Sequence, residues 1–142
     1  MRGGFLHNTA LLNPIEAYLR RRGAQTCREY PVQNSITRGA IDLVATWNDA
    51  VIAIEAELTP DRVVRDVHKA HAIEADLLVI VVPTRRVAAA VIRRLRLNCN
   101  HARKDLPVWV LPLGPALERL RRLFPLFSTL NPGIERNSLT GG

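Results

Sequence analysis

The chain has 142 residues, 47% of them hydrophobic, and its 20 Lys and Arg residues against 13 Asp and Glu residues give a formal charge of +7. This size and apolar content fit one domain with an ordinary core rather than two domains. The longest apolar run, LLVIVVP at 77–83, falls far short of the roughly 20 residues of a membrane span, so we expect no membrane protein. The N-terminus shows no signal peptide, which predicts a cytoplasmic location.

Helical and strand patterns alternate along the chain in the order α-β-β-β-α-β-α-β-α. Asn13-Pro14 marks the start of the first helix and Gly23 its end. The turn NDA at 48–50 joins two strands into a hairpin. The predicted helices span 14–22, 61–75, 85–97 and 115–124, and the predicted strands span 25–32, 40–47, 51–58, 76–83 and 107–113.

This order of elements predicts the fold class and the domain limits. The strand at 76–83 is apolar on both faces, as a central strand covered by helices would be. We therefore expect an α/β fold with a mixed central β-sheet flanked by helices. One domain is expected over residues 1–130, and a mobile tail over 131–142, which lacks apolar periodicity.

Two carboxylates share one face of the strand VIAIEAEL. Period-2 alternation puts Glu55 and Glu57 together, opposite the face that carries Ile52 and Ile54. At about 6 Å and an effective dielectric of about 20, two such charges repel by about 3 kcal/mol. Asp42 lies in the other strand of the hairpin, so three acids converge. Oxygen ligands gathered without Cys or His suit Mg²⁺ or Mn²⁺, and we predict a site for one of these cations.

The order of these acids resembles the PD-(D/E)XK nuclease superfamily, which has the restriction-endonuclease-like fold. GAID at 39–42 matches the family's Asp motif, and IEAE at 54–57 matches its acid-x-Lys motif. The match covers roughly residues 14–112, including an acid on the first helix. The resemblance implies a divalent-metal-dependent DNA endonuclease that hydrolyses phosphodiester bonds by attack of water.

The resemblance also implies roles for individual residues. Asp42, Glu55 and the carbonyl of Ala56 would hold the metal ion. Lys69 resembles the basic or amide residue that the family places on the helix after this motif. The residues expected to act in catalysis are Glu57, Lys69 and Glu16, the last as an accessory ligand.

Glu57 departs from the family pattern, because most members carry Lys at this place. Some restriction enzymes of the superfamily have Glu there and are active. Three roles stay open: Glu57 as a ligand of a second metal ion, Glu57 as a general base, or Lys69 as a substitute cation. The alternative function is a catalytically inactive, nuclease-derived module for DNA binding or assembly. An RNA-directed nuclease is a weaker option.

Arginines near these motifs are candidate phosphate ligands. We expect Arg38, Arg62 and Arg65 to bind nucleic acid, since the net positive charge favours a polyanion. Arg62 and Arg65 could instead pair with Asp61 and Asp66 at the surface. In the helix at 61–75, apolar residues share one face and polar residues another. The apolar face comprises Val63, Val67 and Ala70, and the polar face comprises Arg62, Asp66 and Lys69.

Two further expectations concern partners and metals. The small size, the first-helix acid and the basic surface resemble archaeal Holliday-junction resolvases, which implies a homodimer. A rival zinc site would use His68 and His71, three residues apart, with Cys99 and His101. Their spacing fits no standard zinc motif.

Overall fold

The computed structural model describes residues 2–33, 37–98 and 105–130, so the expected tail at 131–142 lies outside the described residues. The elements follow the predicted order. The helices are α1 (Arg2–Arg21), α2 (Val63–Ala72), α3 (Arg85–Leu97) and α4 (Leu113–Leu130), with a short 3-10 helix, η1 (Pro60–Arg62), before α2. The strands are β1 (Gln25–Gln33), β2 (Arg38–Trp47), β3 (Ala50–Ala56), β4 (Leu77–Val82) and β5 (Val108–Pro112). In these ranges, no helix has the length and apolar character needed to cross a bilayer.

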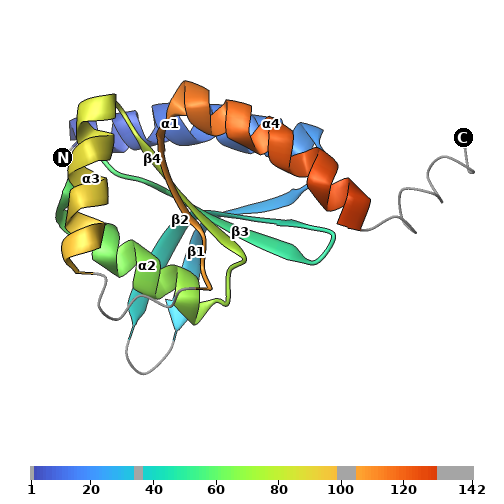
Figure 1. Ribbon diagram of the computed structural model, residues 1–142, viewed down its shortest axis with the longest axis horizontal. Helices are drawn as coiled ribbons and strands as arrows, with labels where there is room; N and C mark the ends of the chain where they lie inside the picture. Colours follow the sequence, from blue (N-terminus) through green and yellow to red (C-terminus); the bar gives the residue numbers. More distant parts are fainter. Residues whose placement is uncertain (1, 34–36, 99–104, 131–142) are drawn as a thin grey trace, which may run out of the picture.

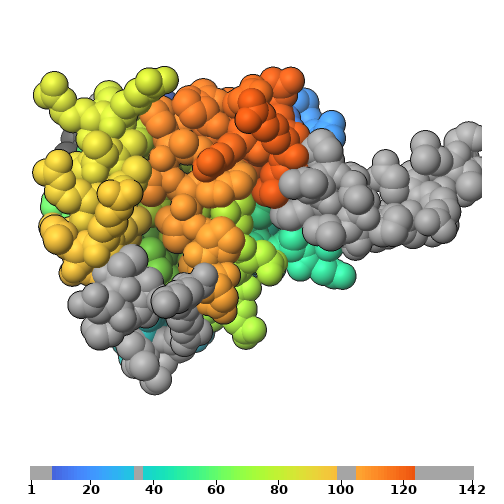
Figure 2. Space-filling model, viewed as in Figure 1, coloured from blue at the N-terminus to red at the C-terminus, as the bar shows by residue number. Residues whose placement is uncertain are grey.

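The five strands form one mixed sheet in the order β1-β2-β3-β4-β5. The first three strands pair antiparallel, and β3, β4 and β5 pair parallel. One core cluster joins the sheet to α1 and α4, and a second joins it to α2 and α3, so helices cover both faces (Figure 1). In Figure 2, the surfaces of α3 and α4 flank the half-buried residues of β5. The predicted α/β fold with a mixed sheet is confirmed.

Helix α1 is longer than the sequence predicts. It begins at Arg2 and passes through Pro14, which the sequence analysis took as its first turn. Pro14 removes one intrahelical hydrogen bond, but an apolar stripe continues on both sides of it and is buried against the sheet. The stripe consists of Leu11, Leu12, Ile15 and Leu19. Gly23, with φ of +95°, ends the helix as predicted.

The β2–β3 hairpin is confirmed, and its turn fixes the register. Asn48 and Asp49 have φ of +50° and +70°, which suits a tight two-residue turn between Trp47 and Ala50. From this turn the ladder runs back to the pair of Leu43 with Ile54. The next level of the hairpin brings Asp42 beside Glu55, as the sequence predicts. Ile52, Ile54 and Ala56 face the α1 and α4 side, so Glu55 faces α2.

The faces of α2 differ from the prediction. Val63 and Ala70 are buried, as expected, but Asp66 and Lys69 are buried with them. Asp66 lies three residues after Val63 and four before Ala70, so it continues the stripe that packs on the sheet. The helix thus buries two charged side chains beside Asp42 of β2 and Glu55 of β3.

Candidate active site

Asp42 and Glu55 continue the β2–β3 ladder with their side chains. Oδ2 of Asp42 accepts a hydrogen bond from the backbone N–H of Ala56 at 2.8 Å, and Oε1 of Glu55 accepts one from the N–H of Asp42 at 3.1 Å. These bonds begin directly beyond the pair of Leu43 with Ile54. Each carboxylate therefore takes the place of a backbone partner, and both are held in a fixed orientation at the end of the β2–β3 ladder.

The two carboxylates line a cleft of about 250 Å³. Ala56 and Glu57 follow them on the β3 side, and the backbone N–H of Glu57 donates to the carbonyl of Val81 at 3.0 Å. The other lining residues are Asn8, Glu29, Gly39, Ala40, Arg62, Arg65, Asp66 and Lys69. The structure thus brings five of the predicted catalytic and metal-binding residues together: Asp42, Glu55, Ala56, Glu57 and Lys69.

Lys69 reaches from α2 into this cluster, and its side chain is almost fully enclosed. Its Nζ lies 2.8 Å from Oε2 of Glu55, donates to the carbonyl of Ala40 at 2.7 Å, and lies 3.7 Å from Oδ1 of Asp66. Burial alone would lower the pKa of Lys69, but the charge of Glu55 and the hydrogen bond to it outweigh burial and raise it. The ammonium is therefore kept charged and is directed at protein oxygens.

Gly39 lies where α2 approaches β2. It has φ of +125°, and a Cβ at this position would lie 3.4 Å from a terminal guanidinium nitrogen of Arg65 and 3.8 Å from Cδ of Lys69. These distances are ordinary van der Waals contacts, so a Cβ would fit, but a larger residue would be strained by the positive φ. The glycine of the GAID motif is thus favoured by its backbone conformation.

Asp66 is a residue of the cleft that the sequence analysis missed. Its side chain is buried, with 1% of the residue exposed, so the alternative of pairing with an arginine at the surface is wrong for Asp66. No N–H or hydroxyl group donates to its Oδ2 atom, and on that side it interacts with the carboxyl group of Glu57. Two ionised carboxylates have no hydrogen to share, so this contact requires either a proton or a cation between them.

The acids of the cleft outnumber its buried cation. Burial, followed by the charges of Asp66 and Asp42, raises the pKa of Glu55 to about 9, more than Lys69 lowers it. Burial also raises the pKa of Asp66, as does the adjacent carboxyl group of Glu57. The pKa of Glu57 is raised by burial and by the charge of Glu55. Lys69 alone does not balance this charge, so the cluster favours a further cation.

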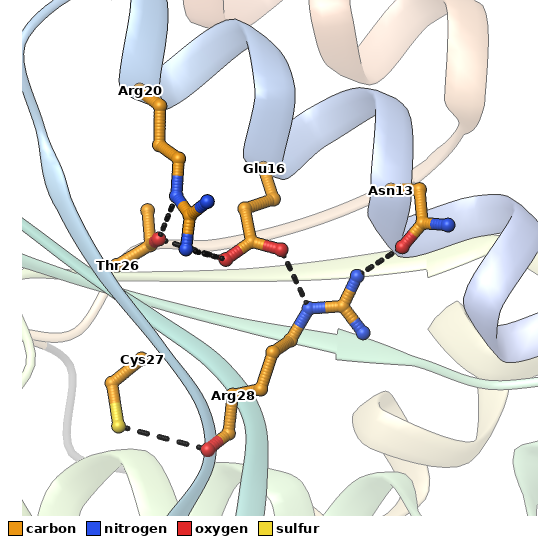
Figure 3. A network of polar contacts seen from close by, with 6 residues as sticks. All are labelled: Asn13, Glu16, Arg20, Thr26, Cys27 and Arg28. Carbon is orange, nitrogen blue, oxygen red and sulfur yellow. Dashed lines mark hydrogen bonds and ion pairs between the residues drawn. The ribbon is translucent and has the colours of Figure 1, made fainter.

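Glu16 lies outside the residues that line the cleft. As Figure 3 shows, it belongs to a network between α1 and β1, where its carboxylate meets Arg28 at 2.9 Å, Thr26 at 2.8 Å and Arg20 at 3.0 Å. Arg28 also donates to Asn13. Burial would raise the pKa of Glu16, but its hydrogen bonds with Thr26 and Arg28 lower it. The structure therefore does not place Glu16 as an accessory ligand.

The residue of α1 that does line the cleft is Asn8, two turns before Glu16. Its side-chain Oδ1 is buried and accepts no hydrogen bond. The sequence analysis began the first helix at Pro14 and so did not consider residue 8. A continuation of the apolar stripe through Leu11 and Leu12 would have revealed the longer helix.

The predicted nucleic-acid ligands lie at the rim. Arg62 and Arg65 are exposed and line the cleft, and a guanidinium nitrogen of Arg65 donates to the carbonyl of Arg38 at 3.0 Å. Arg38 lines a neighbouring hollow of about 590 Å³, which shares Gly39 with the cleft. The three arginines thus occupy one continuous region beside the acids.

The donors of the cleft suit a hard divalent cation in their chemistry. Among the described residues, no three His, Cys, Asp or Glu side chains are arranged to hold a metal ion by themselves. Mg²⁺ needs no such cage, since it keeps several waters and takes one or two carboxylates. The oxygen donors of Asp42 and Glu55, together with the uncompensated Asp66, fit this mode of binding. For the rival zinc site, Cys99 and His101 lie outside the described residues.

Comparison with known proteins gives no further assignment. No family model matches the chain, and no match is found among curated proteins or solved structures. The interpretation of the cleft therefore depends on its own residues and geometry.

Proposed function

We propose that the protein is a divalent-metal-dependent DNA endonuclease that hydrolyses phosphodiester bonds. One observation carries the proposal: Asp42, Glu55 and Glu57 converge in a cleft whose rim carries Arg62 and Arg65. An excess of acidic over basic side chains in the cleft favours the binding of a divalent metal ion. Arginines at its rim favour the binding of phosphate groups. A chain with a net charge of +7 would also attract a polyanion over its whole surface.

Asp42 and Glu55, with the carbonyl of Ala56, would hold Mg²⁺ or Mn²⁺. The metal ion, when bound, would polarise the phosphate and lower the pKa of the attacking water. Lys69 is a positioning residue in this scheme, because its ammonium holds Oε2 of Glu55 and the Ala40 carbonyl. This contact is how the chain compensates for the absence of Lys at position 57.

Glu57 is best suited to the role of general base. It follows Glu55 on the same strand face, and burial raises its pKa, which makes it a better proton acceptor near neutral pH. Asp66, beside it, shares a hydrogen bond with Glu57 and holds its carboxyl group in place. Arg62 and Arg65 would bind the phosphates of the DNA on either side of the scissile bond.

The alternative is a nuclease-derived module that binds DNA without cutting it. A module of this kind gains nothing from burying Glu55 and Asp66 beside a single lysine, which favours the enzyme. The homodimer and the cytoplasmic location stay predictions. Sedimentation of the purified protein would test the first of these.

A cleavage assay with Mg²⁺ or Mn²⁺ on supercoiled, linear, branched and single-stranded DNA tests the proposal. We expect the wild type to nick or cut at least one form and Asp42→Asn to lose activity by about 10²-fold or more. Asp49→Asn is the matched control, because Asp49 lies in the exposed hairpin turn, where Asn also tolerates positive φ. A wild type that binds all four forms and cuts none would favour the inactive module.

A further inference from the structure

Glu29 has an unusual backbone conformation in the middle of β1. Its φ is +50°, in the left-handed region that residues with a side chain seldom adopt within a strand. Glu29 also lines the cleft beside Asp42 and Glu55. Strained backbone of this kind concentrates at functional sites, where the rest of the fold maintains it.

The strain coincides with a switch of faces in the sheet. The β1–β2 ladder pairs Arg28 with Leu43 and Tyr30 with Ile41, so Glu29 lies opposite Asp42. Leu43 packs in the core under α1 and α4, whereas Ile41, two residues before it, packs in the core under α2 and α3. Strict alternation would place both on one face. Glu29, with its left-handed backbone, therefore lies where the two strands rotate locally. This rotation turns residues 29 and 42 toward the cleft.

The carboxylate of Glu29 has no partner to explain this placement. Within the described part of the chain, it forms no hydrogen bond or ion pair. It also faces Asp42 across the strand pair, and like charges in this arrangement repel. Among the described residues, no helix cap or salt bridge of Glu29 compensates for its strained backbone.

A second observation, at Asp66 on α2, also indicates a cation in this cleft. Asp66 is 1% exposed, and its Oδ2 atom receives no hydrogen bond from any N–H or hydroxyl group. Carboxylate oxygens of Glu29 on β1 and of Asp66 on α2, which accept no hydrogen bond from an N–H or hydroxyl group of the described residues, thus line the same cleft. A bound divalent cation with its waters would satisfy both, since oxygen ligands and water-mediated contacts are what Mg²⁺ and Mn²⁺ accept.

We propose that Glu29 is a further carboxylate of the cation site, supplied by β1. The inference rests on the proposed function, because it assigns Glu29 to the same metal ion as Asp42 and Glu55. It also gives the left-handed backbone a role, namely to turn this side chain toward the cleft. The acid that completes the site is then Glu29 on β1, in place of the expected Glu16 on α1.

Two glutamates with the same backbone conformation make the test sharp. Glu74, just after α2, has φ of +56°, is exposed, and is not among the residues of the cleft. Glycine relieves the strain at either position. Glu29→Gly and Glu74→Gly therefore share a structural effect and differ only in the loss of a cleft carboxylate. Glu29→Gln keeps the side-chain shape and removes the charge.

The experiment measures Mn²⁺ affinity by calorimetry and Tm without metal for these three variants and the wild type. We expect Glu29→Gln and Glu29→Gly to weaken Mn²⁺ binding by about 10-fold, the lower end for an outer ligand of a metal site. Glu74→Gly should keep wild-type affinity, and both glycine variants should keep or raise the Tm.

Wild-type affinity in Glu29→Gln, together with weakened affinity in Asp42→Asn, would overturn the role of Glu29 and leave the proposed function standing. A wild type that does not bind Mn²⁺ would overturn both proposals. An equal loss of affinity in Glu74→Gly and Glu29→Gly would assign the effect to the backbone and also overturn the inference.

Discussion

Two groups of carboxylates in this protein differ in how their charge is balanced. Glu16, between α1 and β1, is paired with Arg20 and Arg28, two cations for one acid. In the cleft, Glu55 and Asp66 are buried, and among the described residues Lys69 is their only ion-pair partner. The same residue type therefore has its pKa lowered at Glu16, where pairing outweighs burial, and raised at Glu55, where burial dominates.

The difference shows which acids serve the fold and which serve a ligand. A paired carboxylate such as Glu16 is already satisfied, so it holds α1 to β1 and offers nothing to a cation. An under-compensated carboxylate costs stability in the free protein, and this cost is recovered only when a cation or a proton binds. Charge balance separates the two groups more clearly than residue type does.

The largest expected effect concerns Glu57, which acts only in the cleft. Glu57→Ala should lose cleavage by 10²- to 10⁴-fold, or about 3 to 5 kcal/mol in the barrier, while DNA affinity is kept. Glu16→Ala should retain cleavage, because Glu16 lies outside the cleft. A nicking assay with supercoiled DNA measures both. Equal losses in the two variants would remove the distinction between the groups.

Glu57→Lys restores the residue that is common in the resembled family, and it sharpens this test. If one metal ion suffices, the new cation removes repulsion with Glu55, estimated at about 3 kcal/mol from the separation of alternate strand residues, and activity survives or rises. If Glu57 is the base or a ligand, cleavage is abolished. A variant that binds DNA and loses all cleavage would support a direct role of Glu57, as base or as metal ligand, and retained cleavage would contradict both roles.

The next effect concerns the ion pairs themselves. Lys69→Met leaves Glu55 and Asp66 without their cation, and we expect a loss of about 3 kcal/mol in the free energy of unfolding at pH 9, near the pKa of Glu55. Arg28→Met removes a pair whose arginine is 34% exposed, and should cost about 1 kcal/mol or less. Urea unfolding of both variants without metal measures the difference. If Arg28→Met lowered the free energy of unfolding as much as Lys69→Met does, the proposed difference between the two groups of carboxylates would be contradicted.

The fold and the centre of the site could be predicted because local rules determine them. The Asn-Asp turn fixes the hairpin register, and the register places Asp42 beside Glu55 without any knowledge of the rest of the chain. Lys69 was implied by the resemblance to the nuclease superfamily, and the local pattern alone would have left it on the polar face of its helix. The all-apolar stretch of β4 predicted a central strand with helices on both faces, and the structure confirms it.

The missed residues depend on features that the sequence does not encode locally. Asp66 lies on the boundary of the apolar stripe of α2, and only the packing of the helix decides that it is buried. Glu29 owes its place to one backbone angle. Glu16 was expected as an accessory ligand because it matches the first-helix acid of the resembled family. Helix α1 instead reaches the cleft at Asn8, about 12 Å away along the helix at 1.5 Å per residue.

The last expected effect is on the pH dependence of stability. It is gradual along the pH scale and has opposite signs in the two groups. The pKa of Glu55 is raised in the folded protein, so its stabilising contribution is complete below its unfolded value of 4.5 and is lost as the pH rises toward about 9. The pKa of Glu16 is lowered, so its contribution is present above 4.5 and is lost as the pH falls through its folded value. One titrating group changes the free energy of unfolding by at most about 1.4 kcal/mol per pH unit.

Urea unfolding from pH 3 to pH 9 without metal checks both signs. Glu55→Gln should remove part of the decline between pH 5 and pH 9, and Glu16→Gln should remove part of the decline below pH 4.5. Mn²⁺ should raise the Tm of the wild type more at pH 8 than at pH 5, because binding requires ionised carboxylates and competes with their protons. The Tm of Glu16→Gln should respond to Mn²⁺ as the wild type does, since Glu16 is paired with arginines and takes no part in the cleft. A metal response that is lost in Glu16→Gln and kept in Glu55→Gln would reverse the assignment of the two groups.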